Sequence, residues 1–293
     1  MMLIDPYRFS SVSALATLDS YTSGLNRCCW IRRLLTSYTG SLIRVRKSSG
    51  GDTTTEQDIG YLADNTLDTT ALATFAGSES VVIVKVYDQS GNGKDSVQAT
   101  TGKQPRIVNA GTYDGFIRFD GTDDCLTSAN SGTPSIFSVV SRAALRSTAG
   151  VYVLLEHGNA GPAASHSNAV FYNDGSATQK TNLLLSTNTN YRLNDYTAVT
   201  ISGVMGAVFD YSQSASAKEK LYKAGSLQGV SASGVSGSEP SGSFTADPWN
   251  FGARNNGASL VAPLNSSGFV VWEGVAQSAN MAAINTILAA GAA

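Results

Sequence analysis

Short apolar and polar stretches alternate along most of the chain, and Gly, Ser, Asn and Asp separate the apolar stretches. The clearest stretch, Val81 to Val86, is apolar or β-branched apart from Lys85. This composition is typical of a buried strand. Tyr87 and Asp88 follow, and then a Ser-Gly-Asn-Gly sequence that favours a tight turn. The pattern predicts a strand that ends in a rigid loop, where Asp88 either binds a ligand or only caps the turn.

The same pattern predicts many more short strands. Turn-forming residues separate them at the spacing that is typical of a sandwich or jelly roll. Ser226 to Ser243 is rich in Gly and Ser, which favours a mobile loop. The predicted strands are 42–46, 106–108, 115–120, 136–144, 151–155, 169–172, 182–185, 198–201, 205–211, 250–254 and 269–274, with a hairpin at 220–225.

Two segments show helical spacing instead. Apolar residues between Leu25 and Leu35 recur at intervals that predict a short amphipathic helix. Near the other end, Ser278 is a suitable N-cap for a helix from Ala279 to Ala289. We predict an N-terminal arm at 1–20, which either docks onto a neighbour or stays loose, and one β-sandwich domain at 21–293.

Composition narrows the protein class. The chain is 42% hydrophobic and only 14% charged, which is typical of a β-rich extracellular or virion protein. A net charge of −2 does not favour nucleic-acid binding, and the absence of an apolar run of about 18 residues predicts no membrane span. The three cysteines, Cys28, Cys29 and Cys125, cannot form a disulfide framework, which favours assembly in a reducing compartment.

Charged residues gather in two places. Between Asp19 and Asp52 the chain has several Arg and Lys residues and no acid, so this region either binds an acidic partner or is a solvated outer face. Asp120, Asp123 and Asp124 follow a predicted strand and are weak candidates for a calcium site. A plain hairpin turn explains them as well, and we expect no cofactor.

The central loop carries a resemblance to known families. Its sequence at 87–93, Tyr-Asp-Gln-Ser-Gly-Asn-Gly, together with 37–40 and 74–75, resembles the catalytic β-sandwich of the fungal α-L-arabinofuranosidase B family. With 43–46 and 56–60 it also resembles concanavalin-A/laminin-G-like proteins of tailed bacteriophages. The resemblance implies an all-β, concanavalin-A-like jelly-roll sandwich of two antiparallel sheets, with a short N-terminal and a short C-terminal helix.

The resemblance also implies where the catalytic groups of the arabinofuranosidases are expected. After a Gly-Asn-Ala landmark, here at 158–160, the family's nucleophilic Glu falls on Asn188, and its acid falls on Arg254. Val153 and Leu154 occupy the positions of a cysteine pair that touches substrate. An amide cannot form a glycosyl ester, and an arginine cannot protonate a leaving group at neutral pH. We therefore predict a scaffold without enzymatic activity.

The leading hypothesis is a non-catalytic phage virion protein on head or tail, assembled in host cytoplasm, with a lectin-like sandwich. Expected partners are other virion proteins, further copies of the chain and host-surface polysaccharide, whose sugars stack on aromatic rings and bond to polar groups. The candidate ligand-binding residues are Tyr87, Asp88, Asp123, Asp124, Asn159, Arg254 and Asn255.

Two alternatives stay open. One is an arabinofuranosidase-like glycoside hydrolase with relocated carboxylates, in which Glu156 works with Asp120 or Glu273. The other is a purely architectural capsid decoration protein. His157 and His166, the only histidines, fit no metal or triad pattern.

Overall fold

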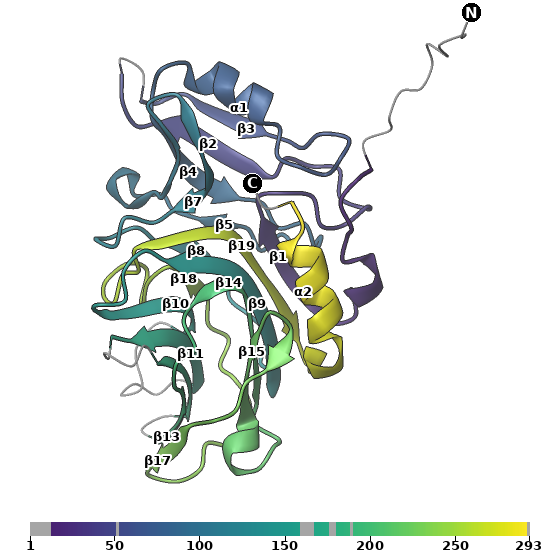
Figure 1. Ribbon diagram of the computed structural model, residues 1–293, viewed down its shortest axis with the longest axis vertical. Coiled ribbons are helices and arrows are strands. Elements are labelled where there is room, and N and C mark those ends of the chain that lie inside the picture. The colour runs from purple at the N-terminus through teal and green to yellow at the C-terminus, as the bar shows by residue number, and fades with distance from the viewer. Residues whose placement is uncertain (1–12, 51–52, 159–166, 176–179, 188–189, 292–293) are drawn as a thin grey trace, which may run out of the picture.

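The computed structural model describes residues 13–50, 53–158, 167–175, 180–187 and 190–291, which form two facing antiparallel layers (Figure 1). In the first layer, neighbouring strands pair in the order β1-β19-β9-β14-β15-β16. Its strands are β1 (Leu25–Trp30), β9 (Ile136–Leu145), β14 (Ser202–Asp210), β15 (Glu219–Lys223), β16 (Ser226–Leu227) and β19 (Leu264–Glu273).

The second layer pairs in the order β3-β2-β4-β5-β8-β18-β10-β11-β12-β13-β17. β6 (Arg106–Asn109) and β7 (Thr112–Arg118) join the layers, because β6 pairs with β4 and β7 pairs with β19. The strands of this layer are β2 (Ile43–Lys47), β3 (Glu56–Ile59), β4 (Val81–Val86), β5 (Ser96–Val97), β8 (Leu126–Ser128), β10 (Val151–His157), β11 (Ser167–Asp174), β12 (Thr181–Thr187), β13 (Asn190–Tyr196), β17 (Ala232–Ser236) and β18 (Trp249–Phe251).

The main core lies between the layers. Leu155 and Phe171 of the second layer belong to one buried cluster with Val139 and Phe209 of the first. These side chains are excluded from water, and burial of apolar area of this kind is the main force that stabilises the fold. The expected all-β antiparallel fold is therefore confirmed at the level of a sandwich.

A second apolar cluster covers the outer face of the first layer. Helix α2 (Met281–Ala289) places Ile284 and Leu288 against Val140 and Val270. This confirms the expected C-terminal helix, although it starts later than predicted, because Ser278 lies in a preceding 3₁₀ turn at Gln277–Asn280. No helix in the described ranges is long and apolar enough to cross a membrane. Shorter 3₁₀ turns lie at Asp19–Tyr21, Thr101–Lys103 and Ala215–Lys218.

The helix predicted between Leu25 and Leu35 is wrong, because this segment begins with strand β1. Cys28 and Trp30 pack into the outer cluster, whereas Cys29 and Ile31 pack into the main core. A strand that is buried on both faces has no polar alternation, so its apolar residues imitate helical spacing. The early helix is instead α1 (Thr69–Ala76), where Asp68 accepts a hydrogen bond from the Ala71 amide at 2.9 Å.

Three other predictions differ from the structure. Residues 198–201 are a turn, with Ala198 at φ 62°, and the strand lies earlier, at β13. The stretch 226–243 is not only a loop, since β16 and β17 lie within it and β17 pairs with β13. The described part of the N-terminal arm docks onto its own chain: Leu18 is buried, and its amide donates to the Leu34 carbonyl at 2.7 Å. Residues 1–12 lie outside the described ranges.

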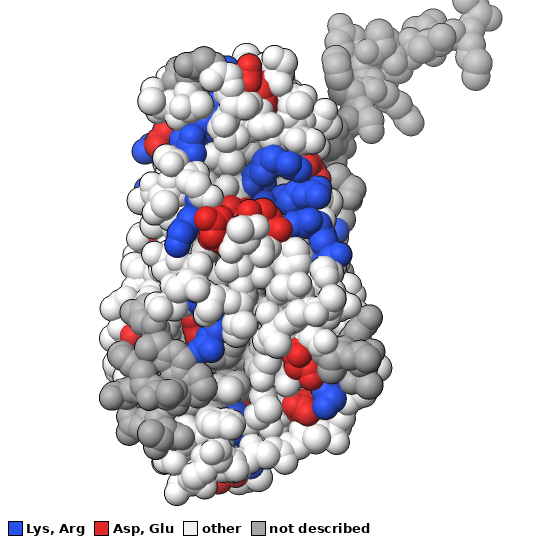
Figure 2. Space-filling model, turned by 90° about the vertical axis from the view of Figure 1, so that its left-hand side faces the viewer, with Lys and Arg blue, Asp and Glu red and all other residues white. Residues whose placement is uncertain are grey.

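The basic segment after Asp19 is divided between the interior and the surface, since three of its arginines are buried whereas the Arg44 side chain is 39% exposed and pairs with Asp58. Arg27, Arg32 and Arg46 are at most 8% exposed. Arg27 donates to Ser128, to the Ala129 carbonyl at 3.1 Å and to Ser131 at 3.0 Å, so its charge organises the interior. Figure 2 shows basic and acidic groups side by side in a band across one face, most of which is uncharged.

The loop after β4 is fixed by the Asp88 carboxylate. One oxygen accepts hydrogen bonds from the amides of Cys28 at 2.8 Å and Ser90 at 2.9 Å. The other accepts from the Ser90 hydroxyl at 2.7 Å and the Lys94 amide at 3.0 Å. With four donors and 5% exposure, Asp88 ties this loop to β1 and has the structural role.

We predict that Asp88→Asn lowers the free energy of unfolding by about 2–3 kcal/mol, because the amide nitrogen cannot accept two of these hydrogen bonds and leaves buried donors unpaired. Urea unfolding followed by circular dichroism measures the change. The control Glu56→Gln alters a carboxylate that is 40% exposed and should change stability by less than about 0.5 kcal/mol. An Asp88→Asn protein as stable as the control would contradict the structural role.

Candidate functional site

The side chains of Tyr87 and Asp88 both form hydrogen bonds within the protein. The Tyr87 hydroxyl donates to Asp58 at 2.8 Å, and Arg44 pairs with the same carboxylate at 2.7 Å. These contacts and the burial of Asp88 leave little of either side chain free for a ligand. Binding through these two residues stays a prediction.

The acidic turn at Asp120, Asp123 and Asp124 is held by its own backbone. Asp120 accepts from the amide of Thr122 at 2.7 Å, and Asp124 accepts from the Asp120 amide at 2.7 Å. These are the hydrogen bonds of a turn whose side chains cap its backbone. One carboxylate oxygen from each of the three lies within 4.8 Å of the others, so a calcium site also stays a prediction.

Arg254 and Asn255, which the sequence placed among the ligand-binding candidates, meet at a buried carboxylate. Glu156 on β10 has no exposed side-chain surface, and Arg254 Nε donates to its Oε1 at 2.8 Å. The Asn255 amide donates to its Oε2 at 2.9 Å. The loop after β18 thus brings two candidates together over Glu156. Asn159 lies outside the described residues.

A groove of about 250 Å³ opens beside this ion pair on the outer face of the second layer. Its walls are mostly apolar, and Arg254 is the charged residue among them. The Nη2 atom of Arg254 is buried and, among the described residues, has no hydrogen-bond partner. The apolar residues of the groove are Val151, Val153, Val170, Tyr172, Leu184 and Leu260.

Polar side chains continue from this groove across β12 and β13. Asn182 donates to Asp195 at 3.0 Å and lies 3.4 Å from the Tyr172 hydroxyl. Lys180 pairs with the same Asp195 carboxylate at 3.2 Å. Tyr172 faces Asn182 and Asn182 faces Asp195 in register, so the three side chains share one face of the layer. The face offers an apolar wall and several hydrogen-bonding groups, which suits a sugar.

A wider depression of about 550 Å³ adjoins β5 and β8. Thr127 and Asn256 line it, and the Thr127 hydroxyl donates to Asn256 at 3.1 Å and to Asn250 at 2.9 Å. Asn250 is opposite Glu156 on the neighbouring strand. This polar row therefore connects the wide depression with the Glu156–Arg254 pair.

The three acids of the relocated pairs considered from the sequence each have partners of their own. Glu156 is held by Arg254 and Asn255, whereas Glu273 accepts from the Gly132 amide at 3.3 Å and lies 3.9 Å from Arg27. In the described ranges, no hydrogen bond or ion pair joins Glu156 to Asp120 or to Glu273. Of these three acids, Glu156 is the one paired with Arg254, a residue that lines the groove.

Comparisons with known proteins agree with the fold. The family described as "Alpha-L-arabinofuranosidase B, catalytic" matches residues 19–122. Alpha-L-arabinofuranosidase B of Emericella nidulans is 36% identical over 96 residues, which cover 31% of this chain and 18% of that protein. A probable alpha-L-arabinofuranosidase B of Aspergillus clavatus is 35% identical over 99 residues, 32% of this chain and 19% of that protein.

Solved structures extend the likeness along the chain. A mutant GH54 a-l-arabinofuranosidase soaked with 4-nitrophenyl a-l-arabinofuranoside superposes with a TM-score of 0.64 at 18% identity, over 90% of this chain and 63% of that one. An arabinofuranosidase complexed with arabinofuranosyl-alpha-1,2-xylobiose gives the same TM-score and identity, over 90% of this chain and 62% of that one. The chain is therefore similar to the catalytic domain of α-L-arabinofuranosidase B, a β-sandwich.

These findings overturn the leading hypothesis. The prediction of a non-catalytic phage virion protein is wrong, because the matched relatives are named arabinofuranosidases and nothing in the comparisons indicates a virion or a decoration protein. The prediction of no enzymatic activity is wrong on the same ground, and the glycoside hydrolase alternative fits better. That prediction rested on Asn188, which lies outside the described residues, and on Arg254, which the structure pairs with a carboxylate.

Sequence reasoning missed the polar residues on β11 to β13. Tyr172, Asn182 and Asp195 lie on three different strands, and only the strand register places them side by side. The sequence did contain one usable signal. Side chains alternate between the two faces of a strand, which puts Tyr172 on the same face as Val170. The alignment of the strands with one another is not contained in that period.

We predict a pH-dependent contribution from Asp124. Burial, and then the charge of Asp120, raises the pKa of the Asp124 carboxyl to about 7. The folded-state pKa thus lies above the unfolded value of about 4, so ionisation destabilises the fold as pH rises from about 4 to about 7. Relative to Asp124→Asn, the wild type should lose on the order of 3 kcal/mol across this window.

Urea unfolding of both proteins at several pH values between about 4 and 8 tests this difference. Asp123→Asn is the matched control and should keep the pH-dependent loss, because Asp123 is less buried than Asp124. Parallel stability curves for wild type and Asp124→Asn would contradict the prediction.

Proposed function

We propose that the protein is an arabinofuranosidase-like glycoside hydrolase whose sugar-binding site is the groove beside Glu156. The observation that supports this most is a buried carboxylate, paired with Arg254, at the edge of an apolar groove in a sandwich similar to arabinofuranosidase catalytic domains. The matched segment covers less than a fifth of the curated relatives, so the activity itself is part of the proposal. A concanavalin-A-like jelly-roll connectivity belongs to the same proposal.

The groove has the chemistry to hold a sugar ring. Val153, Val170 and Leu184 form an apolar floor on which the ring's C–H groups pack. The Nη2 atom of Arg254 is a buried donor without a partner among the described residues, and a sugar hydroxyl can accept from it. Asn182 and Asp195 add polar contacts along the same face. A ligand that satisfies the Arg254 donor removes the cost of leaving it unpaired.

Glu156 is the carboxylate to which we assign the positioning of Arg254 in the groove. Glycoside hydrolysis uses a pair of carboxyl groups that flank the scissile bond, and Glu156, which has no exposed side-chain surface, is not assigned to that pair. Arg254 and the Asn255 amide fix both oxygens of Glu156, so the carboxylate is held in one orientation. Arg254 is 19% exposed and lines the groove, so it is the member of the ion pair that a sugar contacts. Substrate contact with Arg254 therefore acts directly on the environment of Glu156.

Release of 4-nitrophenol from 4-nitrophenyl α-L-arabinofuranoside, and of arabinose from arabinose-substituted xylo-oligosaccharides, tests the proposal. We expect Glu156→Gln to lower kcat/KM by roughly 100-fold or more, because Arg254 loses its charged partner and its fixed position in the groove. Glu79→Gln, a carboxylate far along the chain that contacts Ser49, is the control and should keep wild-type activity. Thermal unfolding verifies that each variant is folded.

A second variant avoids the buried ion pair. Leu184→Trp places a larger ring in the groove and should raise KM at least tenfold, with little change in the circular dichroism spectrum. Failure of the wild type to cleave either substrate, or full activity in folded Glu156→Gln protein, would refute the proposed function.

A further inference from the structure

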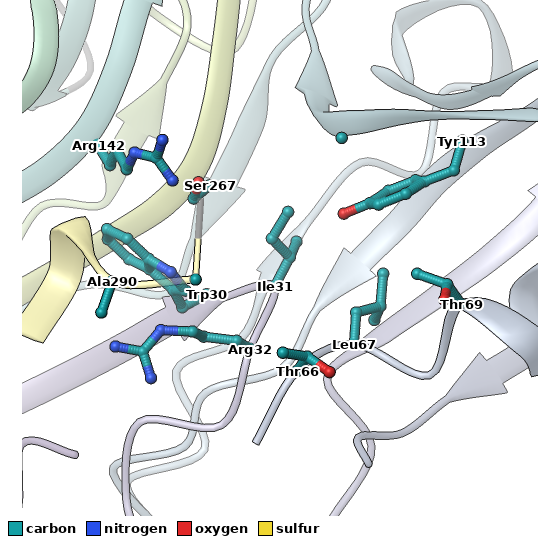
Figure 3. Close-up of a pocket in the computed structure, with 12 residues that line it drawn as sticks. Trp30, Ile31, Arg32, Thr66, Leu67, Thr69, Tyr113, Arg142, Ser267 and Ala290 are labelled. Atoms are coloured by element: carbon teal, nitrogen blue, oxygen red, sulfur yellow. The ribbon is translucent and has the colours of Figure 1, made fainter. Parts of the chain in front are cut away.

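A second cavity, remote from the Glu156 groove, lies where the end of β1 meets the end of α2 (Figure 3). Its volume is about 160 Å³. Segments from β1, the β3–α1 connection, β7, β9 and β19 contribute to its walls. Two arginines, Arg32 and Arg142, line it together with the hydroxyl-bearing Thr66, Thr69, Tyr113 and Ser267.

Arg32 is a buried cation with which no carboxylate of the described residues forms an ion pair. It is 4% exposed, and its guanidinium donates to the carbonyls of Ala16 at 3.0 Å and Ile287 at 2.5 Å. Its Nε atom is buried and, in the part of the chain that the structure describes, has no hydrogen-bond partner. Neutral carbonyls satisfy some of its donors but do not balance its charge.

Arg142 leaves a whole guanidinium available. The side chain is half-buried on β9, and within the described ranges it forms no hydrogen bond and no ion pair. Figure 3 shows the guanidinium groups of Arg142 and Arg32 on either side of Trp30, with Arg142 near Ser267. Burial lowers the pKa of both arginines, and the charge of Arg142 also helps to lower that of Arg32 to about 10. Two like charges thus face one cavity.

The surrounding polar groups do not neutralise this pair. The acids nearest along the chain to this wall are Asp64 and Asp68, which accept from the Thr66 hydroxyl at 2.6 Å and the Ala71 amide at 2.9 Å instead of pairing with an arginine. The Tyr113 hydroxyl points into the cavity in Figure 3 and belongs to a side chain whose pKa is raised to about 12 by burial, so it is an uncharged donor. An unbalanced positive charge with hydroxyl donors is the environment that an oxyanion requires.

A neighbouring depression of about 260 Å³ shares the lining residues Arg142 and Ser267 with this cavity. Phe116 and Asn265 line this part, and the Asn265 Oδ1 atom is buried without a described partner. The depression has room for more than a single inorganic ion. The aromatic ring of Phe116 and the unpaired Asn265 Oδ1 atom lie in the same depression as Arg142. They suit a ligand in which a hydroxyl-bearing ring is attached to the anion.

We propose that Arg142, with Arg32 behind it, forms a binding site for a small oxyanion, either a free phosphate or sulfate ion or the carboxylate of an acidic saccharide. Arg142 supplies the direct contacts, since its donors are free, and Arg32 adds positive potential from beneath. Binding of the anion gives the Arg142 guanidinium a partner and relieves the repulsion between the two arginines. The site is separate from the Glu156 groove, so it does not depend on the proposed hydrolase activity.

Isothermal titration with sodium sulfate, sodium phosphate and D-glucuronate, at constant ionic strength set by chloride, tests the site. We expect saturable binding to the wild type and at least tenfold weaker binding to Arg142→Gln. Arg142→Lys keeps the charge but not the planar fork and should fall between them. Arg44→Gln, which alters an exposed arginine paired with Asp58, is the matched control and should bind like the wild type.

The melting temperature separates lost binding from lost folding. Without oxyanion, Arg142→Gln should melt no lower than the wild type, because the substitution removes like-charge repulsion. With oxyanion, the wild type alone should gain melting temperature, since the ligand binds only the folded state. The Nε–H resonance of Arg32 should shift in the wild type and not in Arg142→Gln.

The relative affinities identify the ligand. Tighter binding of glucuronate than of sulfate or phosphate indicates an acidic saccharide, and the reverse order indicates a free ion. Both orders support the site. No saturable binding below about 50 mM, equal affinity for wild type and Arg142→Gln, or binding of D-glucose as strong as that of D-glucuronate would overturn it.

Discussion

The Asp88 carboxylate is the interaction on which the arrangement of the two layers depends. It accepts hydrogen bonds from a strand of the first layer and from the loop that follows β4 of the second. Gln89 adds to this junction, because it accepts from the Leu34 amide at 2.7 Å and donates to the Arg32 carbonyl at 2.8 Å. Both side chains are buried, so each unpaired group would carry the full cost of desolvation. This junction fixes where β1 lies, and therefore where Trp30 and Arg32 line their cavity.

Buried arginines show how a chain with few charged residues uses them. The guanidinium of Arg27 donates to the hydroxyls of Ser128 and Ser131. Arg46 donates to Gln104 at 2.6 Å and to the Thr101 carbonyl at 2.9 Å. In these cases oxygen atoms of the protein surround the guanidinium. Arg142 differs, because none of the described residues accepts from its side chain. The contrast is what distinguishes a structural arginine from one that is free to bind a ligand.

The groove and its carboxylate were only partly accessible from the sequence. Arg254 and Asn255 were selected as candidates, and the structure does place both at Glu156. Their partner lies 98 residues away from Arg254 along the chain, so local pattern alone does not reveal the pair. From the sequence, Arg254 was interpreted as the loss of a catalytic acid. In the structure, its guanidinium forms an ion pair with the Glu156 carboxylate. Arg254 therefore occupies a position where an acid was expected, and a different strand places the Glu156 carboxylate beside it.

By itself, the sequence determined the location of most strands, because short-range alternation and turn residues report on the local environment of each segment. Val81–Val86 and the strand from Ile136 are examples, as is the C-terminal helix. Tertiary structure decided that Leu25–Trp30 is a strand, since both its faces are covered by partners distant in the chain. It also decided which side chains meet at Glu156 and at Arg142. Those meetings depend on strand register and layer packing, and a linear pattern contains neither.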